Sequence, residues 1–107
     1  MLLCPKVREQ FGGRLEHMIV GGAPLSPQLQ ALIKASLKVT LIQGFGATET
    51  LGVVLCMDNN DMSYSRCGAP LSGIQIKLID WIEGGYKVTD NPNPRGELVV
   101  GSCERLL

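Results

Sequence analysis

LEHMIVGGAPLSPQLQALIKASLKVTLI, residues 15–42, contains the patterns that predict the fold class. It opens with residues 15–20, which are rich in bulky apolar side chains and predict a strand. Glycines and a proline at residues 21–24 break that strand. A second apolar run, residues 39–42, predicts the next strand. Since a helix fits between them, we expect a βαβ unit, in which the two strands are parallel and the crossover is right-handed.

The segment between the two strands has the features of an amphipathic helix. Ser26 followed by Pro27 is typical of a helix start, with the hydroxyl as N-cap and the proline at the first helical position. Apolar side chains at helical spacing indicate the face that packs on the sheet: Leu29, Leu32, Ile33 and Leu37.

The flanking segments extend this unit. Residues 5–11 predict a short helix that ends at Gly12-Gly13, because glycine is a common helix stop. The apolar run at residues 52–57 predicts a further strand.

The second half of the chain has a different pattern. Residues 74–78 alternate with period two, as half-buried strands do. Gly84-Gly85 precedes a possible strand at residues 86–89, which predicts a hairpin-like return, and residues 97–100 predict the last strand. The expected fold class is α/β, with a parallel βαβ part over residues 1–66 and a smaller, mostly antiparallel β-rich part over residues 67–107.

Both glycine-containing turns follow predicted strands of the βαβ unit. Because the carboxyl ends of adjacent parallel strands meet at one edge, residues 21–24 and 44–46 should be neighbours in space. We expect Gly44 and Gly46 to let the backbone turn sharply and approach a ligand.

Residues 43–50, QGFGATET, offer one group for each portion of a magnesium nucleotide. The ring of Phe45 can stack on a base, the Thr48 hydroxyl can donate to a phosphate oxygen, and the Glu49 carboxylate suits a hard cation such as Mg²⁺. A structural alternative is that Thr48 and Glu49 cap a helix, since hydroxyls and acids favour helix N-termini.

Composition limits the alternatives. The chain has 107 residues, 45% of them apolar, which fits one small domain. Its ten basic and ten acidic side chains cancel, and no block of charge indicates nucleic-acid binding. No apolar run reaches the length of a membrane span, and the N-terminal residues do not form a signal peptide. The four cysteines lack zinc-site spacing, and we expect them to be reduced thiols.

Four blocks in order and register resemble the adenylate-forming, AMP-binding enzymes, which include acyl-CoA synthetases, luciferases and peptide-synthetase adenylation domains. They are residues 21–26 (GGAPLS), 43–50 (QGFGATET), 67–70 (CGAP) and 94–98 (PRGEL). Residues 76–86 (IKLIDWIEGGY) and 89–97 are most similar to the long-chain fatty acyl-CoA synthetases of animals. The resemblance identifies the chain as an internal fragment of the large N-terminal domain of such an enzyme.

The resemblance implies a two-step reaction. A fatty carboxylate attacks the α-phosphate of ATP to give acyl-AMP, and coenzyme A then displaces AMP. It implies ATP, a long-chain fatty acid and coenzyme A as ligands, with Mg²⁺ held by Glu49; Thr48 and Glu49 are the expected catalytic residues. The expected nucleotide-binding residues are Gly21, Gly22, Ala23, Pro24, Gln43, Gly44, Phe45, Gly46 and Thr48.

The resemblance also assigns roles to the residues beside the acyl group and to the aromatic ring of Phe45. The resemblance places Gly46 and Ala47 beside the acyl pocket, where glycine leaves room for a long chain. Phe45 stands where the family usually has tyrosine, so the stacking face is kept and the hydroxyl is lost.

The resemblance also implies association with the endoplasmic reticulum, outer mitochondrial membrane or peroxisome, through regions outside this chain and with the active site facing the cytosol.

The family's phosphate loop, its ribose-binding aspartate and its C-terminal domain with the adenylation lysine have no match among the 107 residues. We therefore expect the isolated chain to be inactive. The alternatives are a fragment of another acyl- or aryl-CoA ligase of the same superfamily, and a truncated product without enzymatic activity.

Overall fold

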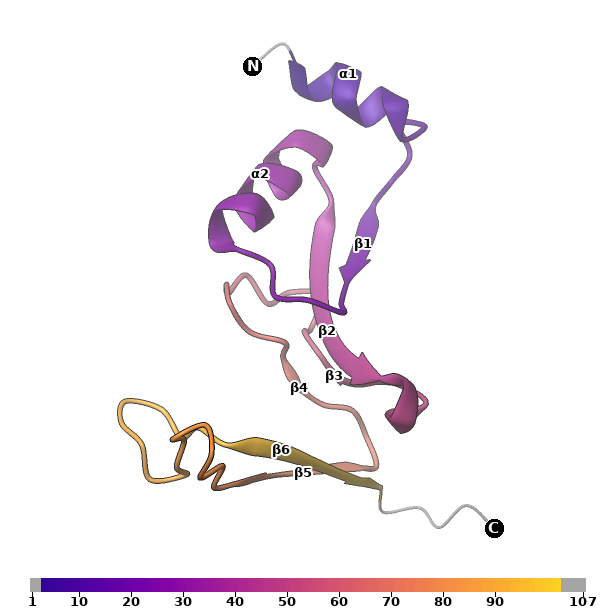
Figure 1. Cartoon of the computed structure of the whole chain (residues 1–107). Coiled ribbons are helices and arrows are strands. Elements are labelled where there is room, and N and C mark those ends of the chain that lie inside the picture. Colours follow the sequence, from indigo (N-terminus) through magenta and orange to yellow (C-terminus); the bar gives the residue numbers. More distant parts are fainter. Residues whose placement is uncertain (1–2, 103–107) are drawn as a thin grey trace. The chain divides into compact units, whose positions relative to one another are not determined.

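The computed structural model describes residues 3–102, which form two compact units with their boundary between Ala69 and Pro70. Unit 1 contains a mixed sheet with two helices, and unit 2 contains a two-stranded sheet (Figure 1). The expected α/β fold is confirmed in unit 1, and the antiparallel β-rich part in unit 2.

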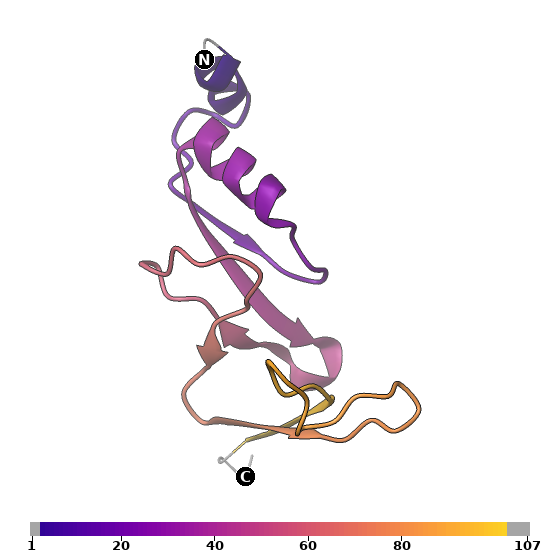
Figure 2. The ribbon, with the colours of Figure 1, turned by 90° about the vertical axis from the view of Figure 1, so that its left-hand side faces the viewer.

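Unit 1 has the predicted βαβ order. Its elements are α1 (Leu3–Gln10), β1 (His17–Val20), α2 (Pro27–Leu37), β2 (Thr40–Ala47), a 3-10 turn η1 (Thr48–Thr50) and β3 (Gly52–Cys56), and β4 (Ala69–Pro70) spans its boundary with unit 2. The strands lie in the order β1-β2-β3-β4. β1 pairs with β2 in parallel, from His17 opposite Thr40 to Val20 opposite Gln43, and α2 forms the crossover (Figure 2).

β2 is longer than the sequence predicts. We expected a sharp turn at residues 44–46, but β2 continues through Ala47 and pairs with β3 in the antiparallel sense, with a bulge between Phe45 and Gly46. The glycine at position 46 serves close approach and not a turn. A Cβ atom there would lie 2.1 Å from the backbone oxygen of Gly52, so only glycine fits between the two strands.

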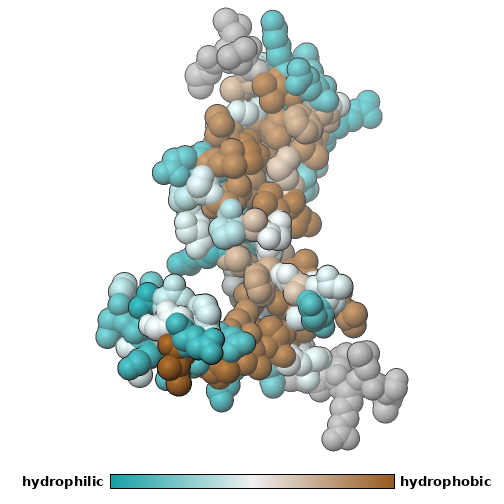
Figure 3. Space-filling view, viewed as in Figure 1, coloured by the Kyte–Doolittle hydropathy of each residue, from teal (hydrophilic) through white to brown (hydrophobic). Residues whose placement is uncertain are grey.

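α2 begins as predicted, because the Ser26 hydroxyl accepts a hydrogen bond from the backbone N–H of Leu29. The predicted packing face is confirmed only at its C-terminal end, where Leu37 is buried and Ile33 is half-buried. Only Leu37 of the four apolar residues is buried, together with the polar Gln30, whereas Leu29 and Leu32 are exposed. The helix is rotated so that Gln30 faces the sheet, and apolar surface is visible over α2 (Figure 3).

The buried apolar core lies in unit 1. It consists of side chains from the end of α2, from the link to β2, from β2 itself and from β3 with the residue after it: Leu37, Val39, Leu41, Ile42, Val54 and Met57. The Arg8 guanidinium of α1 donates hydrogen bonds to the backbone oxygens of Leu37 and Lys38, which joins α1 to the C-terminal end of α2. A cation at this end also suits the helix dipole.

Unit 2 is built on β5 (Ile74–Ile79) and β6 (Glu97–Ser102), which pair in the antiparallel sense. The predicted strand at residues 86–89 was wrong. Tyr86 makes only a single bridge to Trp81, and the partner of β5 is β6. None of residues 70–102 is buried, so a core is confined to unit 1 in the described part of the chain.

The connection between β5 and β6 is held by polar and aromatic contacts. The Arg95 guanidinium lies 4.7 Å from the centroid of the Tyr86 ring and forms an ion pair with Asp90. The Lys87 backbone N–H donates to the Asp90 carboxylate, and this bond, with the charge of Arg95, lowers the pKa of Asp90.

Candidate functional site

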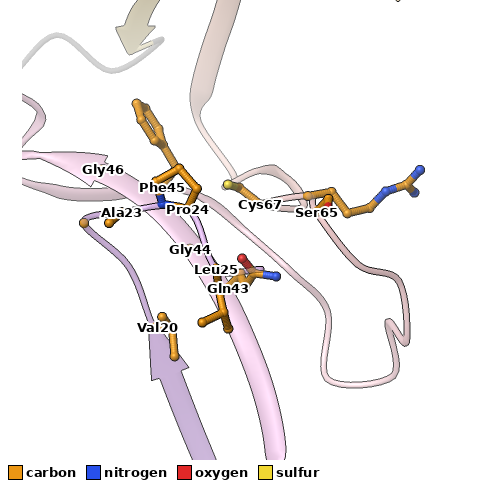
Figure 4. Close-up of a pocket in the computed structure, with 12 residues that line it drawn as sticks. Val20, Ala23, Pro24, Leu25, Gln43, Gly44, Phe45, Gly46, Ser65 and Cys67 are labelled. Carbon is orange, nitrogen blue, oxygen red and sulfur yellow. The ribbon is translucent and has the colours of Figure 1, made fainter. Parts of the chain in front are cut away.

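A cavity of about 340 Å³ opens in unit 1 at the point where β1 ends and β2 changes partner. Its lining consists of Val20, residues 22–25, residues 43–46 and residues 65–67 (Figure 4). The sequence places the first two segments about twenty positions apart, and the parallel pairing of β1 with β2 brings them together.

The predicted proximity of the two glycine segments is confirmed. Val20 is opposite Gln43, so the next residues, Gly21 and Gly44, face each other across the strand ends. A Cβ atom on Gly21 would lie 3.1 Å from the backbone oxygen of Gly44, which is tighter than ordinary contact. Small residues are therefore required for the backbones to meet beside the cavity.

Gln43 and Phe45 present different surfaces to the cavity. Phe45 is 40% exposed, so part of its surface is open to a ligand. Gln43 is buried, and its side-chain Nε2 donates a hydrogen bond of 2.8 Å to Oε1 of Gln30. The Gln43 backbone is also held, since its oxygen accepts a hydrogen bond from the N–H of Met57.

The sequence interpretation missed the third wall of the cavity, formed by Ser65, Arg66 and Cys67. The chain returns to the sheet there because Gly68, with φ +83°, crosses close to the backbone of Cys56. A Cβ atom on Gly68 would lie 2.1 Å from the Cys56 oxygen. The block at residues 67–70 was the available signal, since Cys67 belongs to it and also lines the cavity.

The loop that leads to this wall is stabilised by Asp61. Its carboxylate accepts hydrogen bonds from the hydroxyl and the backbone N–H of Ser63, and these two bonds lower the pKa of Asp61. Since the pKa is lower in the folded chain, the ionised form favours the folded loop.

We therefore expect this contribution to be present above the ordinary aspartate pKa of 3.8 and to be lost as the pH falls through the lowered value. Carboxyl-carbon NMR titration should show Asp61 titrating below its ordinary value. In Ser63→Ala, which keeps the backbone donor, the pKa should rise part of the way back. An unchanged Asp61 titration in Ser63→Ala would contradict the assigned cause.

Thr48 and Glu49 lie outside the cavity lining, in the η1 turn that follows β2. Both are exposed, and neither side chain has a hydrogen bond or ion pair with any residue in the range 3–102. The Thr48 hydroxyl does not cap η1, because Thr50 performs that role, whereas Glu49 lies in the first turn of η1, where the capping alternative expects an acid. The Thr50 hydroxyl accepts from the N–H of Ala47, and its oxygen lies 2.9 Å from the Gly52 oxygen.

The structure thus brings together seven of the nine expected nucleotide-binding residues. The cavity lining includes Gly22, Ala23, Pro24, Gln43, Gly44, Phe45 and Gly46. Gly21 lies directly behind it against Gly44, and Thr48 and Ala47 lie beyond it at the end of β2.

Other classes of site are less supported. Cys4, Cys56 and Cys67 are free thiols, as expected, while Cys103 falls outside the described residues. In the range 3–102 no three metal-binding side chains gather, and no helix has the length and apolarity needed to cross a bilayer.

Comparison with known proteins decides the family. The profile of the family described as AMP-binding enzyme matches residues 3–104, nearly the whole chain. This chain belongs to the AMP-binding enzyme family. Long chain acyl-CoA synthetase 8 of Arabidopsis thaliana is 43% identical over 100 residues, which are 94% of this chain and 14% of that protein.

Two further relatives of this AMP-binding chain extend the comparison. Long chain acyl-CoA synthetase 6, peroxisomal, of Arabidopsis thaliana is 35% identical over 92% of the chain and 14% of its own length. The adenylation domain of a carboxylic acid reductase from Segniliparus rugosus, in complex with AMP and a co-purified carboxylic acid, has 36% identity and a TM-score of 0.75, covering 95% of the chain and 15% of the domain structure. The resemblance to long-chain acyl-CoA synthetases is therefore confirmed through plant enzymes, and the particular likeness to those of animals stays a prediction.

Proposed function

We propose that this chain supplies the purine-binding part of a long-chain fatty acid–CoA ligase, which activates fatty acids with ATP. The observation that carries the proposal is the cavity between the ends of β1 and β2, in a chain of the AMP-binding enzyme family. The chain spans 14% of the length of long chain acyl-CoA synthetase 8, so the ligase activity is proposed for the whole enzyme.

The nucleotide is proposed to lie with its purine in the cavity. The backbone of Gly21, Gly22, Ala23 and Pro24 borders the purine edge, and small residues there permit close approach. The half-exposed ring of Phe45 stacks on the purine face, an arrangement that needs no hydroxyl. Gln43, Gly44 and Gly46 complete the opposite wall.

The triphosphate is proposed to extend toward η1. The exposed hydroxyl of Thr48 and carboxylate of Glu49 have no protein partner in the described range, so both are open to a ligand. One carboxylate together with substrate phosphates is a usual environment for Mg²⁺. When bound, the cation would neutralise charge on the phosphate oxygens. Glu49 would hold the cation, and Thr48 would orient a phosphate group.

The remaining ligands are a long-chain fatty acid and coenzyme A. The acyl chain is proposed to pass Gly46 and Ala47, near the end of β2. The complete ligase would form acyl-AMP and then acyl-CoA, and the isolated 107-residue chain would not catalyse either step. Membrane association through other regions belongs to the same proposal, and one relative is named peroxisomal.

A second candidate is the adenylation part of a carboxylic acid reductase, favoured by the TM-score of 0.75 and 36% identity to the Segniliparus rugosus domain. The higher identity of 43% to a long chain acyl-CoA synthetase favours the ligase. Both candidates use the same purine cavity.

The cavity is tested directly by titrating the 107-residue chain with AMP and following amide NMR signals. We expect shifts at residues 22–25 and 43–46. Phe45→Ala should weaken AMP binding by about tenfold or more, because a base that stacks on an aromatic ring gains roughly 1–3 kcal/mol.

Two controls accompany this titration. Phe11→Ala removes an exposed ring from a segment outside the cavity lining and should leave AMP affinity unchanged. Ribose 5-phosphate, which lacks the purine, should bind far more weakly than AMP. Absence of AMP binding, or equal affinity in Phe45→Ala and wild type, would contradict the proposed purine site.

A further inference from the structure

Two glutamine side chains bury their amide groups beside the cavity. Gln30, on α2, is 0% exposed, and Gln43, on β2, is 6% exposed. Glutamine is usually exposed, because an amide taken out of water without partners costs free energy. The partners of these two amides therefore determine how each is oriented.

The orientation begins at a backbone carbonyl, which can only accept hydrogen bonds. Nε2 of Gln30 donates to the backbone oxygen of Ser63 at 3.1 Å. Oε1 of Gln30 is consequently directed toward Gln43 and accepts from its Nε2 at 2.8 Å. Because the NH₂ group of a side-chain amide donates and its oxygen accepts, Oε1 of Gln43 is the last atom in this series of hydrogen bonds.

That last oxygen is open to the cavity. It accepts no hydrogen bond from any residue in the range 3–102. Every fully buried side-chain nitrogen or oxygen in that range does have a hydrogen-bond partner. Oε1 of Gln43 must therefore be accessible to solvent. In Figure 4 it points toward the part of the cavity lined by Pro24 and Cys67.

The start of this series of hydrogen bonds is itself held in place. The backbone N–H of Ser63 donates to Asp61 at 2.9 Å, so the Ser63 carbonyl is anchored by its own turn. A rotation of the Gln43 amide by half a turn would place its NH₂ group in the cavity. It would also place two acceptor oxygens, those of Gln30 and Gln43, against each other in a buried site.

We propose that Gln30 is a positioning residue that makes the purine site select a 6-amino purine over a 6-oxo purine. The inference rests on the proposed function. An exocyclic amino group donates to Oε1 of Gln43, whereas a 6-oxo group would set two acceptors face to face. Without the acceptor of Gln30, the Gln43 amide would rotate to suit either ligand.

The test compares AMP with IMP, which differ at this position of the ring, in calorimetric titrations of the 107-residue chain. Wild type should bind AMP about tenfold or more tightly than IMP, since a mismatched polar group is typically worth at least that factor. In Gln30→Met, of similar size, the preference should fall to within about twofold, because the amide is free to turn. Gln28→Met, an exposed position on the same helix, should keep the wild-type preference.

A conservative variant separates positioning from packing. In Gln30→Glu, burial favours the protonated acid, which can donate to Ser63 and accept from Gln43, so the AMP preference should return. Loss of the preference in Gln30→Glu, or its persistence in Gln30→Met, would overturn the inference.

One readout needs no variant. The side-chain amide protons of Gln43 should exchange with water about tenfold or more slowly than those of exposed Gln28, because one is held by Gln30. Equal exchange rates would overturn the positioning role even if Gln30→Met failed to fold. If the wild-type chain binds AMP and IMP with equal affinity, the inference about Gln30 fails but the proposed function stands. If it binds neither nucleotide, both the inference and the proposed function fail.

Discussion

The Gly46→Ala substitution is expected to unfold unit 1. The added Cβ atom would lie 2.1 Å from the oxygen and 2.7 Å from the carbonyl carbon of Gly52, and 2.8 Å from the Cα atom of Val53. All three atoms belong to the backbone, so no side-chain rotation relieves the collision. β2 and β3 would have to separate, which would remove the pairs between residues 44–47 and β3.

The cost should exceed about 3 kcal/mol, the upper end of the usual range for overpacking. Such a loss is a large fraction of the stability of a small domain. Chemical denaturation followed by circular dichroism measures it, together with the dispersion of amide NMR signals.

Two other glycines provide matched controls. Gly44, in the same strand, would place its Cβ atom 3.3 Å from a Val53 methyl group, so Gly44→Ala should cost much less. Gly101, in β6, has nothing within 4 Å of a Cβ atom, and Gly101→Ala should be nearly neutral. A Gly46→Ala chain as stable as Gly44→Ala would show that the close approach of β2 to β3 is not required.

The second large effect is expected on activity. In a chimera that carries residues 3–102 in place of the matching segment of Arabidopsis long chain acyl-CoA synthetase 8, Glu49→Gln should lower palmitoyl-CoA formation. We expect a fall of about 100-fold or more, as when one charge-stabilising group is removed from an active site. The amide keeps the size of the side chain and loses the charge that would hold Mg²⁺.

Stability should not change, because Glu49 is exposed and has no partner in the described range. Glu16→Gln, another exposed acid of unit 1, is the control and should keep full activity. The Mg²⁺ dependence of ATP binding by the 107-residue chain is an independent readout, and Glu49→Gln should weaken it. Unchanged activity and unchanged Mg²⁺ dependence would remove Glu49 from the site.

Local features of the sequence predicted the elements of unit 1 well. Ser26 and Pro27 mark the start of α2, and both apolar runs of the βαβ unit form strands, because N-caps, proline positions and apolar periodicity act within a few residues. The same rules placed residues 21–24 and 44–46 together, since parallel pairing across a helix leaves little freedom.

The wrong predictions for unit 1 share a physical cause. Gly44 and Gly46 were interpreted as turn residues, but glycine also allows two backbones to approach, and which use applies depends on a partner strand elsewhere in the chain. The apolar face of α2 was partly misassigned because Gln30 takes the buried position, where Gln43 and Ser63 satisfy its amide.

From the sequence alone, the family, the βαβ order and most of the residues that border the cavity could be predicted, because each depends on short motifs and on the period of apolar residues. The wall at residues 65–67, the helix cap at Thr50 and the direction of the Gln43 amide became visible only in the folded chain. These depend on hydrogen bonds and close contacts between atoms brought together by folding, and an amide or a glycine shows its role only when its neighbours are in place.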